Sequence, residues 1–299
     1  MITDDTTKQF ADLFTGRTDA YGTDTGGACW QPVTYATYER HLTGTEPIGI
    51  YPVVNNMVRW GCCDIDTGDW SEAYLLATAL KGMGLVPHVE RSRSKGWHIW
   101  IFLPEFVAAS DMRRCLKVAY KAIDLPAKEA NPKSELLRPN QLGNYVRLPY
   151  KAGAVVNPCR QVMMGYWNVQ CDGMPLALGE WLRYGTEVGG KTFSDPNKIK
   201  AWAAKWYEPP RKSASIDTDN DVDVVRLADK LPTDWRKIWL HGEVRDRSAT
   251  FVAMAHNLAK CGWQPQDVYD ILWACPWNKY RDRRDGEGYV QDIVDRAYS

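Results

Sequence analysis

The sequence predicts an α+β fold with a mixed sheet, followed by a small all-helical region. Between positions 48 and 151, short apolar runs rich in aromatic and β-branched residues alternate with amphipathic segments. After Gly173 the apolar residues recur with helical spacing. A stretch rich in proline, serine and alternating charge interrupts this second part. We therefore expect an α+β domain over residues 1–207, a linker over 208–222 and a helical domain over 223–299.

The elements of the first domain follow from local patterns. Residues 48–66 are typical of two strands joined by a turn at Asn55 and Asn56. The next segment predicts a helix that Thr67 or Asp69 caps and that Gly82 or Gly84 ends. The other predicted elements are strands at 85–92 and 96–104, helices at 108–123, 174–185 and 197–208, and two short strands around a Gly143-Asn144 turn.

The helical domain is expected to contain helices at 224–232, 245–262, 264–276 and 287–299. No apolar run is long enough to span a membrane, and the polar, acidic N-terminus does not resemble a signal peptide. The eight cysteines show no CxxC spacing, which disfavours a zinc site or a disulfide framework. We interpret them as reduced thiols of a cytoplasmic protein.

Charge is unevenly distributed along the chain. The formal net charge is zero, but Val86 to Arg160 holds 13 Lys and Arg against 6 Asp and Glu. Such a basic zone can attract phosphate even when the whole molecule is neutral. The alternative is a solvated basic face with no ligand.

Two carboxylates follow an apolar strand in the segment GCCDIDTGDW. Residues i and i+2 of a strand project from the same face, so Asp64 and Asp66 point together, about 7 Å apart along the backbone. Oxygen ligands at this spacing suit Mg²⁺ or Mn²⁺. The alternative is a pair of aspartates that caps the next helix.

The segment ERSRSKGWHIWIF joins a polar turn to an aromatic strand. Serine hydroxyls at Ser92 and Ser94, the Lys95 ammonium, backbone amides beside Gly96 and the imidazole of His98 could together hold a triphosphate. Alternatively, His98 is a structural residue of the strand.

A third acid, Glu135, lies in SELLRPNQLGNYVRLPY, with Arg138 and Arg147 nearby in sequence. One more carboxylate on a neighbouring strand would complete a three-acid metal site, and the arginines could contact phosphates. Taken alone, Glu135 is a surface glutamate.

The order of these motifs resembles the archaeo-eukaryotic primase superfamily, in particular the primase-polymerases of phages, plasmids and related mobile elements. That family has a strand with DxD, a Ser/Gly turn ending in GxH, and an acid on a later strand. Asp64 with Asp66, His98, and Glu135 match this pattern, with Glu129 as the fallback for the third acid. The phrase GNYVRLPY resembles the family's segment after that acid, and the similarity covers residues 21–160.

The resemblance implies a DNA primase and template-directed polymerase of a bacterial host cytoplasm, active in phage or mobile-element replication. Two Mg²⁺ or Mn²⁺ ions on Asp64, Asp66 and Glu135 would activate the attacking hydroxyl and neutralise the triphosphate. His98 would clamp the triphosphate rather than act as a base, with Ser92, Ser94, Lys95, Arg138 and Arg147 as further clamp candidates. The implied partners are a single-stranded DNA template, nucleoside triphosphates and, as an open alternative, a fused or separate replicative helicase, with no membrane.

The last part of the chain resembles the small helical domain that follows the catalytic domain in such primases, which implies help with primer initiation. Its candidate phosphate contacts are Arg245, Arg247, Lys279, Arg281, Arg283 and Arg284, against the alternative of a solvated surface. Trp263, Trp273 and Trp277 are expected to pack between helices rather than to stack on bases. A metal-dependent nuclease and a non-catalytic single-stranded nucleic-acid-binding module stay open as rival functions.

Overall fold

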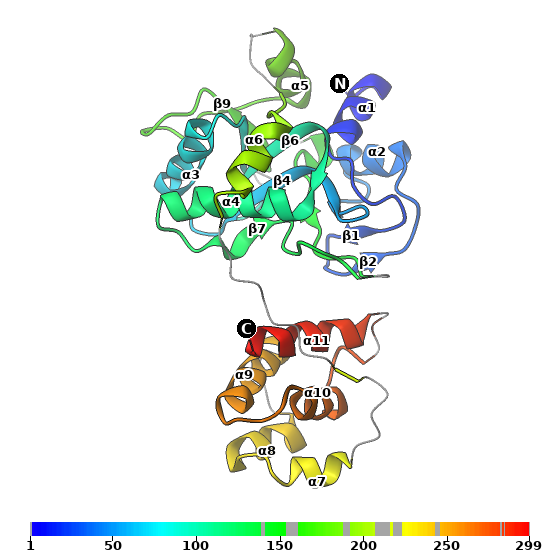
Figure 1. Ribbon diagram of the computed structural model, residues 1–299. Coiled ribbons are helices and arrows are strands. Elements are labelled where there is room, and N and C mark those ends of the chain that lie inside the picture. The colour runs from blue at the N-terminus through cyan, green and yellow to red at the C-terminus, as the bar shows by residue number, and fades with distance from the viewer. Residues whose placement is uncertain are drawn as a thin grey trace. The chain divides into compact units, whose positions relative to one another are not determined.

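The computed structural model describes residues 2–138, 141–153, 161–187, 192–206, 216–217, 223–242, 246–281, 283 and 285–298. The chain divides into two compact units, Met1–Leu137 with Leu142–Tyr207, and Arg138–Gln141 with Glu208–Ser299. The α+β class is confirmed: sheets and helices build the first unit, and helices build the second (Figure 1). Apart from Ile216 and Asp217, the predicted linker 208–222 lies outside the described residues.

A six-stranded sheet forms the centre of the first unit, in the order β10-β9-β5-β6-β4-β7. Its strands are β4 (Met57–Ile65), β5 (Pro87–Arg91), β6 (Trp97–Ala108), β7 (Ala130–Asn131), β9 (Val162–Gly165) and β10 (Met174–Pro175). A smaller sheet has the order β2-β1-β3-β8, with β1 (Tyr21–Thr23), β2 (Ala28–Cys29), β3 (Ile48–Ile50) and β8 (Val146–Arg147).

Every strand pair in the described chain is antiparallel, where the sequence predicted a mixed sheet. The β4–α3–β5 segment has the length of a parallel crossover unit. However, β6 lies between β4 and β5 and pairs with both of them, so the crossover produces no parallel ladder.

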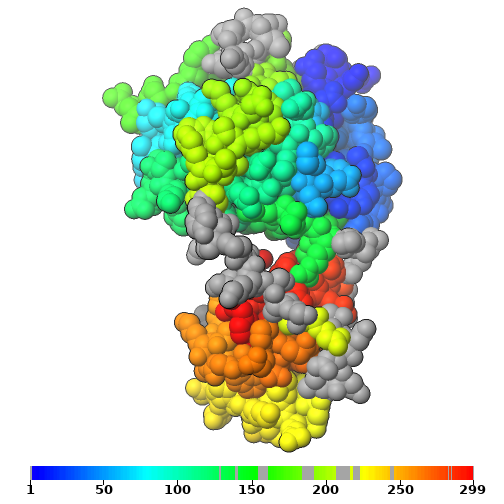
Figure 2. All heavy atoms as spheres, in the orientation of Figure 1, coloured from blue at the N-terminus to red at the C-terminus, as the bar shows by residue number. Residues whose placement is uncertain are grey.

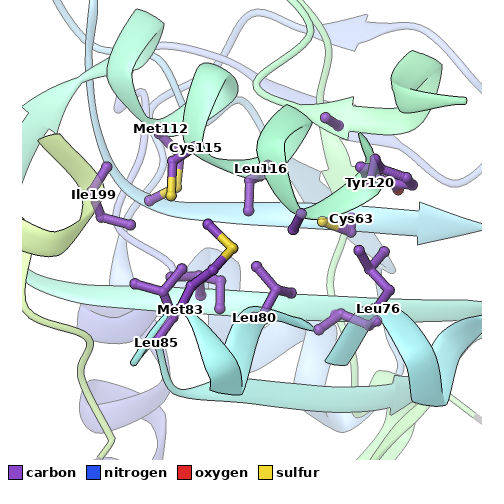
Figure 3. Packing of buried hydrophobic residues seen from close by; sticks show 14 of the residues in the cluster. Cys63, Leu76, Leu80, Met83, Leu85, Met112, Cys115, Leu116, Tyr120 and Ile199 are labelled. Atoms are coloured by element: carbon purple, nitrogen blue, oxygen red, sulfur yellow. The ribbon is translucent and has the colours of Figure 1, made fainter. Parts of the chain in front are cut away.

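Three helices cover one face of the large sheet: α3 (Trp70–Gly82), α4 (Ala109–Ala122) and α6 (Pro196–Ala203). Asp69 caps α3 by accepting a hydrogen bond from the Ser71 amide at 2.9 Å, as one of the two predicted caps. Figure 3 shows the side chains of α3 and α4 meeting those of β4. Figure 2 shows α6, in yellow-green, lying against α4. This core buries Cys63, Leu76, Leu80, Met112, Cys115, Leu116, Tyr120 and Ile199.

The opposite face of the sheet packs an aromatic cluster against α1 (Asp4–Leu13), α2 (Tyr35–Thr43) and α5 (Leu178–Glu187). Because side chains alternate along a strand, Trp60 and Cys62 of β4 point into this second cluster while Cys63 and Ile65 point into the first. Asp64 therefore lies on the face of Trp60 and Cys62. The neighbouring strand contributes Trp100 and Phe102 to the same face.

The second unit contains α7 (Val224–Ala228), α8 (Thr233–His241), α9 (Arg247–Lys260), α10 (Pro265–Ala274) and α11 (Gly286–Ala297), drawn yellow to red in Figure 1. Its core includes Phe251, Leu258, Leu272 and Val294, all fully buried. The tryptophans expected to pack between helices, Trp263, Trp273 and Trp277, all lie against this core.

Within the described ranges, no helix is long and apolar enough to cross a membrane. The seven cysteines in those ranges are free thiols.

Candidate active site

Three polar side chains form a row across the large sheet. In the register of the strands, Asp64 of β4 lies opposite His98 of β6, and His98 lies opposite Glu90 of β5. Directly opposed residues of antiparallel strands project from the same face. The structure accordingly places His98 Nε2 3.6 Å from Asp64 Oδ1 and His98 Nδ1 2.9 Å from Glu90 Oε2. Asp64 and His98, predicted from separate motifs, are therefore brought together.

Glu90 is the member of the row that the sequence analysis missed. It is fully buried and accepts a second hydrogen bond, from Trp100 Nε1 at 2.5 Å. Its other oxygen, Oε1, is buried with no hydrogen-bond partner among the described residues. The available signal was an acid inside the predicted strand 85–92, because a strand buried on both faces rarely carries a charge without a nearby cation.

Charge coupling in this row changes both titrations. Burial by itself would lower the pKa of His98, but the charge of Glu90 and its hydrogen bond, with the charges of Asp64 and Asp66, raise that pKa to about 9. Burial raises the pKa of Asp64; the charge of His98 opposes this rise, and the charges of Asp66, Glu129 and Glu90 add to it. The site is therefore crowded with carboxylates around one imidazolium.

The raised pKa of His98 predicts how stability varies with pH. The folded pKa lies above the ordinary value of 6.5, so the stabilising contribution is complete below about pH 6.5 and is lost as pH rises through about 9. We expect the free energy of unfolding to fall by at least about 1 kcal/mol across this window. Urea denaturation at several pH values should show the fall in the wild type and a smaller one in His98→Gln. Parallel pH curves for the two proteins would contradict the coupling.

Asp66 lies just beyond the end of β4 and is exposed, whereas Asp64 is partly buried. The turn before β6 packs directly on this strand end: a Cβ built on Gly96 would lie 2.2 Å from the Ile65 carbonyl oxygen. A glycine is needed here because any side chain would push the turn off the strand. The turn and the aspartate pair are consequently held side by side.

Ser92 closes the turn. Its amide donates to the Gly96 carbonyl and its Oγ accepts from the Gly96 amide, both at 3.0 Å. Ser92 is buried, whereas Ser94 and Lys95 at the tip are exposed. Ser92 thus shapes the turn, and the two tip residues offer their polar groups to solvent.

The structure does not bring Glu135 to the aspartate pair. Its carboxylate pairs with Arg114 at 3.0 Å, Lys117 at 3.8 Å and Arg113 at 3.9 Å. These three cations belong to α4, which packs on the Cys63 face of β4, opposite to the face of Asp64.

Glu129, the fallback for the third acid, lies beside Asp64 instead. It ends the short helix η1 (Ala127–Glu129) and immediately precedes β7, where Ala130 is opposite Cys63 of β4. One step along this ladder puts Glu129 next to Asp64, and its charge adds to the rise in the pKa of Asp64. Its carboxylate pairs with Lys133 Nζ at 2.5 Å.

The two candidate arginines belong to different units. Arg147 of β8 donates from Nη2 to the Asp24 carbonyl oxygen at 3.0 Å. Arg138 is grouped with the helical unit, where it donates to the Gly288 carbonyl oxygen at 3.0 Å and pairs with Asp292 at 3.3 Å and Asp295 at 3.9 Å.

Several of the basic residues proposed as phosphate contacts in the helical domain interact with other residues of that domain. Lys279 Nζ donates to Ser248 Oγ, and Arg281 donates to the Trp273 carbonyl oxygen at 3.0 Å. Arg283 lies over the rings of Tyr280 and Tyr289. Arg247 begins α9. Arg245 and Arg284 lie outside the described residues.

In the part of the chain that the structure describes, no group of three or more His, Cys, Asp or Glu side chains forms a ready-made metal site. The acids near His98 therefore supply oxygen donors on one sheet face without a closed coordination shell.

Comparison with known proteins gives a family match for the segment that carries this site. Residues 23–158 match the model described as "TOTE conflict system, Archaeo-Eukaryotic Primase domain". No curated protein matches the chain.

Two solved structures are similar. The crystal structure of primase RepB' has a TM-score of 0.32 and 14% identity, covering 99% of this chain and 94% of that chain. The AEP domain of the cyanophage S-2L primase-polymerase has a TM-score of 0.34 and 14% identity, covering 60% of this chain and 97% of that chain. Both TM-scores are below 0.5, so the assignment rests on the sequence match. Residues 23–158, which hold Asp64, His98 and Glu129, therefore match the model of an archaeo-eukaryotic primase domain.

Proposed function

We propose that this protein is a primase-polymerase that makes and extends primers on a single-stranded DNA template from nucleoside triphosphates. The observation that carries the proposal is the convergence of Asp64 with His98, and of Glu129 and Asp66 around them, inside the matched primase segment. Phage or mobile-element replication is the setting we propose, and the name of the matched family adds a conflict system as an alternative setting.

The acids fit a hard divalent cation. Asp64, Asp66 and Glu129 are oxygen donors. Burial raises the pKa of Asp64, and the charges of Asp66 and Glu129 add to the rise, so a bound cation would favour the ionised form. Mg²⁺ usually binds through one or two carboxylates, several waters and substrate phosphates, so a closed three-residue cage is not required. When bound here, Mg²⁺ or Mn²⁺ would lower the pKa of the attacking hydroxyl and neutralise charge on the triphosphate and the departing pyrophosphate.

The protein's own contribution is positioning. Gly96 and Ser92 fix the turn against the end of β4, and Glu90 holds the ring of His98 at the row's centre. The imidazolium of His98, with Ser94 and Lys95 at the exposed tip, would bind the triphosphate beside the acids. Catalysis of this kind depends on orientation and preorganised charge rather than on proton transfer by a side chain.

Other parts of the proposal extend beyond the acids. The basic zone from Val86 to Arg160 would contact the template backbone, with binding that weakens as salt rises. The helical domain, residues 223–299, would assist primer initiation. A replicative helicase is a further partner that we propose. Ser92 would act by shaping the turn before β6, and Arg138 is a further candidate for binding the triphosphate.

The test incubates the protein with single-stranded DNA, Mg²⁺ or Mn²⁺, and labelled nucleotides. New oligonucleotides longer than the added primer, or formed without one, would support the proposal. Shortened template would mean a nuclease, and no product together with retained template binding would mean a binding module.

Replacing His98 by alanine should mainly weaken nucleotide binding. The variant loses the imidazolium that faces the triphosphate, and hydrogen bonds to charged groups are worth about 1.5–3 kcal/mol, so we expect KM to rise at least about tenfold. Steady-state incorporation at varied nucleotide concentration measures this change. His88→Ala is the matched control, because His88 lies in β5 of the same sheet and is bonded to the Thr192 carbonyl. Unchanged KM and rate in His98→Ala would contradict the clamp role.

A further inference from the structure

Asp24, at the turn between β1 and β2, is surrounded by three basic side chains. Arg93 Nη1 donates to Asp24 Oδ1, Lys151 Nζ lies 3.3 Å from Asp24 Oδ2, and Arg147 Nε lies 3.8 Å from Asp24 Oδ1. Arg93 comes from the β5–β6 turn, Arg147 from β8 and Lys151 from η2 (Lys151–Gly153). Segments far apart in the sequence thus converge on one carboxylate.

Among the described residues, this cluster holds more positive than negative charge. Three positive side chains share the single negative charge of Asp24, and Arg147 Nε is buried with no hydrogen-bond partner among the described residues. Burial alone would raise the pKa of Asp24, but the Lys151 hydrogen bond and the charges of Arg93 and Lys151 lower it below its ordinary value. The carboxylate is therefore held ionised among donors that it cannot fully satisfy.

A phosphate group matches the donors better than a carboxylate does. A terminal phosphate carries more charge and three acceptor oxygens, and the guanidinium fork binds such groups through paired hydrogen bonds. The side chains are also accessible: their exposed fractions are 43% for Arg93, 40% for Arg147 and 27% for Lys151. An anion can consequently reach the cluster from solvent.

We propose that Arg93, Arg147 and Lys151 form a phosphate site in which Asp24 is an internal counter-ion that the triphosphate tail of a nucleotide displaces. The inference rests on the proposed function, which gives the protein a nucleotide substrate, and deepens it by adding Asp24 as a competitor for the phosphate. Asp24 then sets how tightly the nucleotide binds.

The position of Arg93 favours a triphosphate over a polynucleotide backbone. Arg93 lies between Ser92 and Ser94 in the turn that leads into His98, and Gly96 of this turn packs against Ile65 at the end of the strand that carries Asp64. The three basic side chains exceed the single charge of Asp24 by two positive charges. A terminal phosphate carries more negative charge than a phosphodiester, so it neutralises this excess better when it replaces Asp24.

The test measures binding, without catalysis. Isothermal titration of inorganic tripolyphosphate is compared between the wild type, Asp24→Asn and Lys151→Gln. Removing the competitor should tighten tripolyphosphate binding about three- to tenfold, and removing a donor should weaken it by a similar factor, as expected for partly exposed charge pairs. The same factors should appear with a nucleoside triphosphate as ligand.

Asp5→Asn is the matched control, because it removes one negative charge from an exposed position of helix α1 in the same unit. It should leave tripolyphosphate binding unchanged. Weaker or unchanged binding in Asp24→Asn would overturn the counter-ion role, with circular dichroism melting to verify the fold. If Asp24→Asn tightened only a single-stranded oligonucleotide, the triphosphate assignment would be wrong.

Failure of the inference is separable from failure of the proposed function. A protein that synthesises oligonucleotides but binds tripolyphosphate equally well with Asp24 or Asn would lose only the inference. A protein that makes no oligonucleotides yet responds to Asp24→Asn would retain the phosphate site and lose the polymerase assignment.

Discussion

Asp64→Asn should lower nucleotide incorporation at least about a hundredfold, because it removes an oxygen donor of the proposed metal site and the charge that faces His98. Asparagine keeps the shape of the side chain but is a neutral, weaker ligand. Single-turnover primer extension with labelled nucleotides in Mg²⁺ and in Mn²⁺ measures the change.

The fold should survive this substitution. The raised pKa of Asp64 means that the folded chain disfavours its charged form, so a neutral side chain removes that cost while it gives up the His98 pair. We therefore expect a melting temperature close to that of the wild type. The control is Asp69→Asn, an aspartate at the N-cap of α3 where asparagine also caps well. Normal synthesis by Asp64→Asn would remove Asp64 from the site.

Local sequence patterns predicted the parts of the site that lie on well-marked strands. β4 and β6 are long, apolar and rich in aromatic residues, and the polar residues at their ends stand out. The resemblance to the primase superfamily put Asp64 and His98 at one site, and the structure puts their side chains 3.6 Å apart. Strand register decides such contacts, and long strands limit the choices of register.

The pairing of strands that lie far apart in the sequence could not be predicted from local sequence patterns. Residues 48–66 were predicted as two strands joined by a turn, and Asn55 and Asn56 do form it, with positive φ angles of 50° and 61°. However, β3 pairs with β1 and β8 of the small sheet, while β4 pairs with β6 and β7 of the large one. A turn fixes the chain direction but does not decide whether the strands beside it pair.

Short strands and their neighbours were missed for a related reason. Residues 174–185 were predicted as a helix, whereas Met174–Pro175 forms β10 and α5 begins only at Leu178. β7 has two residues, too few to show alternation, although it is the strand that follows Glu129. Such elements are defined by the edge they pair with, which lies elsewhere in the sequence.

Glu129→Gln and Glu135→Gln should separate the two candidates for the third acid. Both substitutions remove one carboxylate charge and keep the side-chain shape. Glu129 precedes β7 and acts on the titration of Asp64, so its amide variant should reduce incorporation about a hundredfold. The concentration of Mn²⁺ needed for half-maximal rate should rise as well.

Glu135→Gln should leave incorporation within about threefold of the wild type, because the carboxylate pairs with Arg113, Arg114 and Lys117 of α4. Its effect should appear in stability instead, at no more than about 1 kcal/mol for a partly exposed ion-pair cluster. Urea denaturation measures that loss, and primer extension measures the rates. Nucleotidyl transfer requires a carboxylate beside the metal, and a carboxylate that pairs with the cations of α4 does not serve this purpose. A severe loss of synthesis in Glu135→Gln, together with normal synthesis in Glu129→Gln, would therefore make Glu135 the third acid.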